Sequence, residues 1–197
     1  MSLQNLLTVL YKSVTEFPCN AFRTYFTSNH DENSWNGTEY EKYGEAAQLF
    51  AVFSCTWNGI PMIYSGQELP NKKRLKFFEK DVIVWQQRFE LHDFYKTLLT
   101  LHSTNRSLRA GDTEVLTRIV SHPDDHQVFS YLRKHETDEV LIVLNCSAEG
   151  MHFQVKNVKG VFRNVFGGDD INFTTNDQVY LNAWGYLVFE RVPMLSE

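Results

Sequence analysis

Two short apolar segments with a helical segment between them place the strongest constraint on how this chain folds. Residues 21–26 (AFRTYF) and 62–64 (MIY) have the composition of short strands, and the apolar residues between them have helical spacing. A strand–helix–strand unit of this length favours two parallel strands joined by a right-handed crossover. Parallel strands end on the same side of a sheet, so we expect the polar residues after each strand, among them Gln67 and Glu68, to meet there.

A dense polar cluster follows the first of these strands. It consists of the consecutive residues Asn29, His30, Asp31, Glu32 and Asn33. Burying such groups without hydrogen-bond partners costs about 1–3 kcal/mol each. One interpretation is a hydrophilic turn that caps the next helix. The other is a ligand site at the carboxyl end of a parallel strand, where barrels place their chemistry.

Three helices are expected before residue 106. The first covers the start of the chain and ends before Pro18, whose ring disfavours helix at the preceding residue. The second begins at Thr38, whose spacing to Glu41 is that of a capping box, and continues through Phe53. The third spans residues 92–104, where leucines and a phenylalanine recur at helical spacing.

A long loop over residues 69–87 separates the second strand from the third helix. Four basic residues lie in its first half, namely Lys72, Lys73, Arg74 and Lys76. They suit either a phosphate-bearing partner or ion pairs with Glu79 and Asp81, and the ion pairs are the preferred interpretation.

After Gly111-Asp112 the sequence changes to short β-rich runs separated by turn signals. We expect strands at residues 115–120, 128–132, 140–144, 151–155, 161–166, 171–173, 178–181 and 185–189. Several runs alternate apolar with polar residues, as half-buried antiparallel strands do. Turns at spacings of roughly 8–12 residues favour a sandwich or a barrel-like sheet. We therefore place a domain boundary near residues 106–112.

Composition excludes several classes of protein. The chain is 43% hydrophobic, which is typical of a folded core, and its net charge of −5 argues against a general nucleic-acid surface. No apolar run approaches the roughly 20 residues of a membrane span. Cys19, Cys55 and Cys146 form neither a metal-ligand spacing nor a disulfide framework, so we expect buried free thiols. These features leave the localisation open.

The motifs around the two strands resemble the α-amylase family of glycoside hydrolases. Residues 26–31 (FTSNHD) are similar to the strand-seven motif of that family, and residues 59–68 (GIPMIYSGQE) look like its strand-eight segment. Residues 77–85 look like the loop that follows, and the β-rich region resembles the family's small C-terminal antiparallel domain.

This resemblance implies a fold class and a division into domains. The fold would be of mixed α+β type, a C-terminal fragment of a (β/α)8 TIM barrel followed by an antiparallel β-sandwich domain. Residues 1–108 would be the C-terminal part of the catalytic barrel, with strands seven and eight and their flanking helices. Residues 109–197 would be the C-terminal all-β domain.

The resemblance also implies roles for single residues. Asp31 would be the catalytic carboxylate that grips sugar hydroxyls and stabilises the transition state, and His30 would donate a hydrogen bond to the same sugar. Such hydrogen bonds strengthen in the transition state and contribute several kcal/mol to glycoside cleavage. Asn29 would orient the loop backbone. Trp35 and Tyr40 come just after the motif, and their rings suit either sugar stacking or packing.

The reacting carboxylates of the family have no counterpart here. Retaining glycosidases use two carboxylates about 5–5.5 Å apart, which this family carries on strands four and five. No segment before Ala21 resembles those strands. We therefore expect the C-terminal part of an α-amylase-like glycosidase, whose full-length form cleaves α-glucosidic bonds of starch or maltodextrin with retention. The chain alone would be inactive and without a cofactor or metal, because the calcium frequent in this family would be bound elsewhere.

Two other function classes remain open. One is an amylase-like protein that does no catalysis, although the Asn29-His30-Asp31 cluster favours an enzyme. The other is a carbohydrate-binding accessory domain formed by the β-rich region. Its candidate aromatic residues are Phe162, Phe166, Tyr180 and Trp184, and the alternative for each of them is a place in the core. The expected partner is an α-glucan oligosaccharide or polysaccharide, with neither nucleic acid nor membrane. An incomplete parallel sheet leaves open edges, which predicts self-association or a partly disordered N-terminal half.

Overall fold

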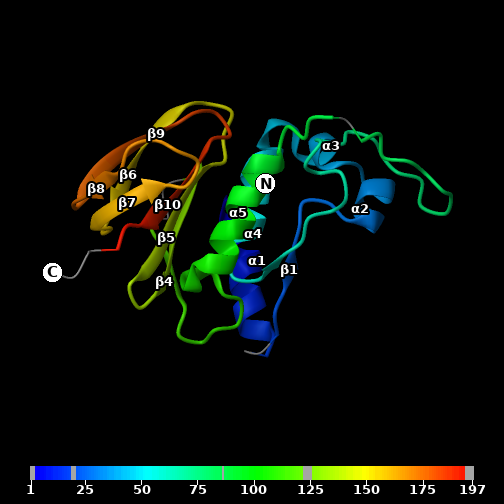
Figure 1. Cartoon of the computed structure of the whole chain (residues 1–197). Coiled ribbons are helices and arrows are strands. Elements are labelled where there is room, and N and C mark those ends of the chain that lie inside the picture. Colours follow the sequence, from blue (N-terminus) through cyan, green and yellow to red (C-terminus); the bar gives the residue numbers. More distant parts are fainter. Residues whose placement is uncertain (1–2, 19–20, 86, 122–125, 194–197) are drawn as a thin grey trace.

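The computed structural model describes residues 3–18, 21–85, 87–121 and 126–193, and it shows a helical region beside a β region (Figure 1). The elements of the helical region are α1 (Leu3–Glu16), β1 (Thr24–Tyr25), α2 (His30–Trp35), α3 (Glu39–Tyr43), η1 (Gly44–Ala46), α4 (Ala47–Thr56), β2 (Ile60–Pro61), α5 (His92–Thr104) and η2 (Arg106–Leu108). Helices α4 and α5 lie between the β region on one side and the part containing β1 and α2 on the other (Figure 1).

The strand–helix–strand prediction is confirmed. Strands β1 and β2 pair in parallel, with Thr24 opposite Ile60. The Ile60 amide donates to the carbonyl of Arg23 at 2.8 Å, and the Met62 amide donates to the carbonyl of Tyr25 at 2.9 Å. The second strand was expected at residues 62–64 and lies two residues earlier. The parallel pairing ends at Met62 because the chain then turns.

The capping box at the start of the second helix is confirmed. The Glu41 amide donates to the Thr38 hydroxyl at 3.2 Å, and the Thr38 amide donates to the Glu41 carboxylate at 2.9 Å. The single helix expected from Thr38 to Phe53 is instead divided into α3, η1 and α4. Gly44 has φ of +57°, a conformation that ends α3 and that residues with side chains rarely adopt. The third helix has the predicted bounds.

The β region consists of two antiparallel sheets. Its strands are β3 (Leu116–Ile119), β4 (Val128–His135), β5 (Asp138–Asn145), β6 (Met151–Lys156), β7 (Gly160–Asn164), β8 (Ile171–Phe173), β9 (Asn176–Leu181) and β10 (Tyr186–Arg191). Six strands form a sheet in the order β3-β4-β5-β10-β7-β8, and β6 pairs with β9 in a second sheet. Each of the eight predicted runs contains or overlaps one of these strands, so the sandwich prediction is confirmed.

Strand β5 is covered on both faces. Val140, Ile142 and Leu144 point into a core shared with α4 and α5, whereas Leu141 and Val143 point into a core between the two sheets. All five side chains are at most 1% exposed. A strand buried on both faces needs a continuous apolar run, which explains why this segment does not alternate with polar residues.

The two regions share the first of these cores. Phe53 and Trp57 of the helical region pack on Phe129 and Tyr131 of β4, and the Trp57 and Tyr131 ring centroids are 4.8 Å apart. The Thr56 and Tyr131 hydroxyls also share a buried hydrogen bond of 2.6 Å. The division into residues 1–108 and 109–197 stays a prediction.

Two smaller expectations concern thiols and membranes. Cys55 is buried and free, as predicted, and Cys146 is free and half-buried, while Cys19 lies outside the described residues. Burial raises the pKa of the Cys55 thiol to about 12 and that of Cys146 to about 11. Within the ranges that the structure describes, no helix has the length and apolarity needed to cross a bilayer.

Two adjacent leucines of α5 allow a matched test of the shared core. Leu98 is completely buried, whereas Leu99 is 40% exposed. We expect Leu98→Ala to lower the free energy of unfolding by about 2–5 kcal/mol, through lost burial and a residual cavity. Leu99→Ala should cost less than about 1 kcal/mol. Urea unfolding followed by circular dichroism measures both, and equal losses would contradict this packing.

Candidate functional site

Buried hydrogen bonds tie the carboxyl ends of β1 and β2 together. The side-chain amide of Gln67 donates to the hydroxyl of Thr27 at 2.7 Å and to that of Tyr95 at 3.2 Å, and its oxygen accepts from the Tyr64 amide at 2.6 Å. Gln67 and Thr27 are each 3% exposed. Gln67 was expected at this edge of the sheet from the sequence, but its bonds to Thr27 and Tyr95 were not predicted. Gln67 holds the two strand ends in a fixed relation.

The polar cluster after β1 both caps a helix and presents exposed polar groups. The side chain of Asn29 accepts a hydrogen bond from the Glu32 amide at 2.7 Å, so Asn29 is the N-cap of α2. His30 and Asp31 form the first turn of this helix. Their side chains are 73% and 56% exposed, and His30 Nε2 lies 3.6 Å from Asp31 Oδ2. The capping interpretation therefore holds for Asn29, and a donor and an acceptor remain open to solvent beside it.

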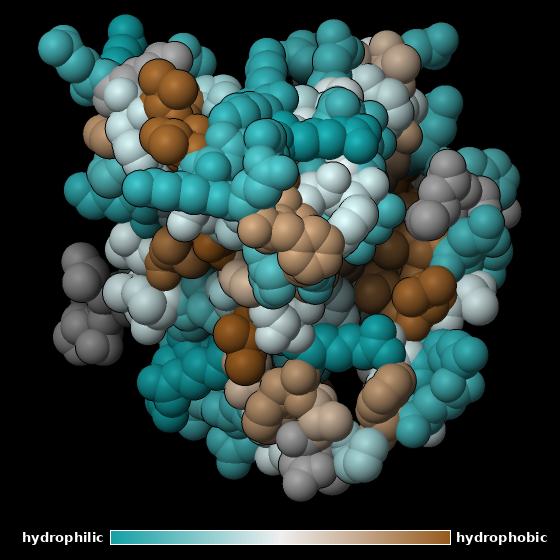
Figure 2. All heavy atoms as spheres, turned by 90° about the vertical axis from the view of Figure 1, so that its right-hand side faces the viewer, coloured by the Kyte–Doolittle hydropathy of each residue, from teal (hydrophilic) through white to brown (hydrophobic). Residues whose placement is uncertain are grey.

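An aromatic cluster, formed by Trp35, Phe77 and Phe78, lies next to these groups. The Trp35 ring centroid is 5.2 Å from that of Phe77 and 6.0 Å from that of Phe78, and the His30 ring stacks on Phe77 at 6.3 Å. Trp35 is 58% and Phe78 is 85% exposed. Figure 2, which views the side of the molecule that carries α2 and α3, shows brown patches set among hydrophilic residues.

Tyr40 is not part of this cluster. It is half-buried at the start of α3, and the Lys72 ammonium lies 5.3 Å from its ring centroid. Burial, together with the nearby charges of Glu39 and Glu90, raises the pKa of its hydroxyl. No contact joins Tyr40 to Trp35 among the aromatic pairs of the described residues.

Helix α2 also anchors the loop that follows β2. The Asn33 side chain, 2% exposed, accepts from the Leu75 amide at 2.7 Å and donates to the Lys73 carbonyl at 3.3 Å. The Ser34 hydroxyl donates to the Leu75 carbonyl at 2.6 Å. These bonds hold residues 73–75 against α2. Phe77 and Phe78 follow shortly after this anchored segment.

Three of the four basic residues of the loop form ion pairs, two of them with the acids preferred from the sequence, while Lys72 lies over the Tyr40 ring. Lys73 pairs with Asp81, Arg74 with Glu41 and Lys76 with Glu79. Glu32 pairs with Lys42 at 3.4 Å. The hydrogen bond from Arg74 lowers the pKa of the Glu41 carboxyl to about 2, and that from Lys73 lowers the pKa of Asp81 to about 2.

Asp31 differs from these acids. Within the described ranges its ion-pair partner is His30, whereas Glu32, Glu41, Glu79 and Asp81 are each paired with a lysine or arginine. An exposed carboxylate without a permanently charged partner keeps its lone pairs available for a ligand.

Glu39 is a further acid that sequence reasoning missed. It is 3% exposed at the start of α3, and burial raises the pKa of its carboxyl. Hydrogen bonds from its own backbone and from Gln67 lower this pKa, but by less than burial raises it. The capping-box spacing marks Glu41 in the sequence, but no sequence signal indicates that Glu39 is buried.

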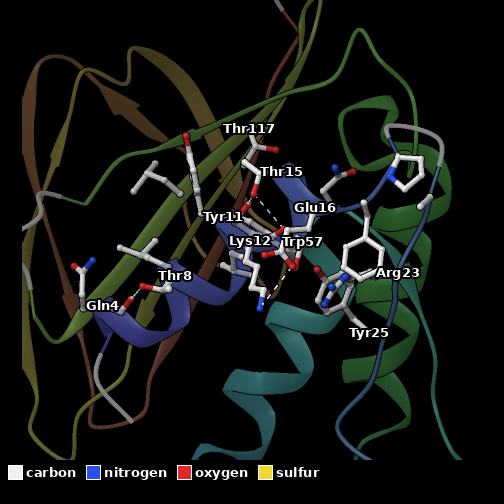
Figure 3. Close-up of a pocket in the computed structure, with 18 residues that line it drawn as sticks. Gln4, Thr8, Tyr11, Lys12, Thr15, Glu16, Arg23, Tyr25, Trp57 and Thr117 are labelled. Carbon is white, nitrogen blue, oxygen red and sulfur yellow. Dashed lines mark hydrogen bonds and ion pairs between the residues drawn. The ribbon is translucent and has the colours of Figure 1, made fainter.

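A cavity of about 1040 Å³ lies at the other end of the two strands (Figure 3). Residues of α1, Arg23, Trp57, Asn58 and Thr117 line it. Arg23 and Asn58 precede β1 and β2, so the cavity lies at the amino ends of these strands. Barrel enzymes carry out their chemistry at the carboxyl ends, and the residues predicted for the site lie there instead.

Comparisons with known proteins found relatives of this chain. Residues 119–188 match the family model described as Maltogenic Amylase, C-terminal domain. Alpha-amylase 2 of Dictyoglomus thermophilum is 26% identical over 159 residues, which is 75% of this chain and 26% of that protein. The chain is related to the C-terminal part of α-amylase family enzymes. It spans about a quarter of the length of that relative.

Solved structures show the same fold. The maltogenic α-amylase AmyB of Thermotoga neapolitana superposes with a TM-score of 0.80 at 19% identity, covering 98% of this chain and 47% of that one. The α-amylase of Geobacillus thermoleovorans, solved as a complex with acarbose, gives a TM-score of 0.77 at 18% identity, covering 96% of this chain and 43% of that one. These matches bear out the expected fold class, in which a barrel part precedes a β-sandwich.

The aromatic residues suggested for a binding face on the β region do not form one row. For Phe162 the core alternative holds, because it is completely buried in the core between the sheets. Phe166 is 36% exposed but stacks on Phe94 at 5.6 Å. Tyr180 is 54% exposed and contacts His152, and Trp184 is half-buried.

Proposed function

We propose that this chain contributes part of the sugar-binding site of a glycoside hydrolase that acts on α-glucans. The observation that carries the proposal is the grouping at the carboxyl end of β1. Here the exposed His30 and Asp31 side chains lie 3.6 Å apart, and His30 stacks on the aromatic cluster. A carboxylate acceptor, an imidazole donor and flat apolar rings are the groups that bind a pyranose, whose edge carries hydroxyls and whose face is apolar.

Each residue has a defined part in this proposal. Asp31 accepts hydrogen bonds from sugar hydroxyls and stabilises the oxocarbenium-like transition state, while His30 donates to the same sugar. Trp35 stacks on a neighbouring sugar face. Asn29 fixes the direction of α2 through its cap, so that the first turn presents His30 and Asp31 together. Tyr40, which lies outside the aromatic cluster, stays a proposed sugar contact on the basis of its ring alone.

The names of the related proteins support an α-glucan as the ligand. They are an alpha-amylase and a maltogenic α-amylase, and a further relative was solved with acarbose. In the complete enzyme we propose retaining hydrolysis, which requires a nucleophile and an acid/base about 5–5.5 Å apart. The acids nearest Asp31 in the sequence and in the following loop are paired with lysine or arginine, which leaves them poorly suited to either role.

Binding of maltoheptaose to the chain tests the site. Isothermal titration calorimetry should show saturable binding, and Asp31→Asn and Trp35→Ala should each weaken it at least tenfold. Trp85→Ala is the matched control, because Trp85 is 55% exposed and Trp35 is 58% exposed. Asp170→Asn is the control for charge, since Asp170 pairs with Arg163 in the β region.

Other outcomes decide between the function classes. Binding that Tyr180→Ala abolishes and Asp31→Asn leaves intact would contradict the proposed site and favour a carbohydrate-binding surface on the β region. If the native chain does not bind maltoheptaose, both the proposed site and a binding surface on the β region are contradicted. That result would favour an amylase-like protein that does no catalysis.

We further propose that the chain alone does not hydrolyse starch. In this proposal Asp31 stabilises a transition state, and the reacting carboxylate pair comes from strands of the barrel that resemble nothing in this chain. The pure chain should release no more reducing sugar from maltodextrin than a buffer blank does. Release that Asp31→Asn abolishes would show that the chain carries a complete active site, contrary to this expectation.

Self-association is the remaining proposal. The parallel sheet of β1 and β2 has two strands and therefore two open edges, and Phe22 and Ile60 beside them are 50% and 47% exposed. Light scattering coupled to size exclusion should give a mass that rises with concentration above the 23.0 kDa of one chain. A constant 23.0 kDa up to high concentration would be the contrary result.

A further inference from the structure

A buried histidine faces two carboxylates where the helical region meets the sheet. His135, the last residue of β4, is 2% exposed. Its Nε2 atom lies 3.4 Å from a carboxylate oxygen of Glu114 and 3.8 Å from one of Asp112. Neither ring nitrogen has a hydrogen-bond partner in the described part of the chain. A buried polar group without a hydrogen-bond partner destabilises the fold, so an imidazole in this position needs an explanation.

The segment before β3 is folded so that both carboxylates face the histidine. Asp112 Oδ1 accepts a hydrogen bond from the Glu114 amide at 3.0 Å, and the Asp112 carbonyl accepts from the Val115 amide at 3.2 Å. The other oxygen of Asp112, Oδ2, is the one that faces His135. Gly111, with φ of +73°, supplies the turn before Asp112.

We propose that Asp112, Glu114 and His135 bind a zinc ion. Their ligand atoms all lie within 4.8 Å of one another. Tetrahedral zinc with bonds of about 2.0–2.2 Å to nitrogen and oxygen places neighbouring ligand atoms roughly 3.3–3.6 Å apart. The His135–Glu114 separation of 3.4 Å lies in that interval, and the His135–Asp112 separation of 3.8 Å is slightly longer.

The donor set decides the kind of metal. One imidazole nitrogen and two carboxylate oxygens suit zinc, whereas calcium and magnesium take oxygen ligands throughout. With three protein ligands, a fourth position would be left for water. The Glu114 side chain is 76% exposed, so the ion could enter from solvent on that side.

Zinc at this position would link the segment between η2 and β3 to the end of β4. Asp112 and Glu114 belong to the segment between η2 and β3, and His135 ends the strand against which η2 packs. The site lies in the connecting segment and not at the carboxyl end of β1. It is thus independent of the proposed sugar site.

Zinc titration of the metal-free chain tests this site. Calorimetry with zinc chloride should show one ion per chain bound with micromolar or tighter affinity, and zinc should raise the Tm. Glu114→Gln should weaken binding at least tenfold and lose most of the Tm rise. This variant changes an exposed side chain, so loss of the fold is not expected, and circular dichroism checks it.

Glu136→Gln is the matched control. Glu136 is 70% exposed, follows His135 directly and pairs with Arg106 at 3.7 Å, so the substitution removes the same charge nearby without touching the three ligands. Its zinc affinity should stay within twofold of the native value. Zinc held by other histidines would be unaffected by Glu114→Gln.

Three results would overturn the proposal. They are no saturable zinc binding up to millimolar concentration, equal zinc affinity in Glu114→Gln and Glu136→Gln, and tighter binding of calcium chloride than of zinc chloride. The first two would mean that His135 only contacts the two acids and holds no metal with them.

Discussion

The packing of Phe53 and Trp57 on Phe129 and Tyr131 is the interaction on which the rest of the structure depends. These four rings lie in the core that α4 and α5 share with β4, β5 and β10. A parallel sheet of two strands is too small to be stable alone. The helices that follow each strand bury their apolar faces against the β region instead. Through this core the sandwich stabilises β1 and β2. Hydrogen bonds from Gln67 to Thr27 and to Tyr95 of α5 then fix the strand ends where the polar cluster begins.

Most of the fold could be predicted from the sequence, because its elements have strong local signals. The third helix has an unbroken apolar pattern, and the eight β runs are separated by turn residues, so each was expected near its observed place. The bounds of the short elements could not be predicted in the same way. Strand β2 is defined by two hydrogen bonds to Arg23 and Tyr25, and the division at Gly44 depends on one backbone angle. The first is decided by a tertiary contact, and the second by a left-handed conformation that glycine tolerates.

The candidate site could be predicted only in part, for a similar reason. The polar cluster and its place after a strand were visible in the sequence, and so was the capping alternative for Asn29, which the structure shows. The buried Gln67, the buried Glu39 and the anchoring of the loop by Asn33 depend on contacts across about 30 to 40 residues. Residue type and spacing do not reveal such contacts, and the same holds for Asp112, Glu114 and His135.

The central claim is that the carboxyl end of β1 holds a sugar. A crystal structure of the chain soaked with maltoheptaose tests it most directly. We expect a glucose unit with hydroxyls within hydrogen-bond distance of Asp31 and His30, and a sugar ring stacked on Trp35. Sugar in the cavity at the amino ends of the strands, lined by Arg23 and Asn58, with the Asp31 side chain left in solvent, would contradict it.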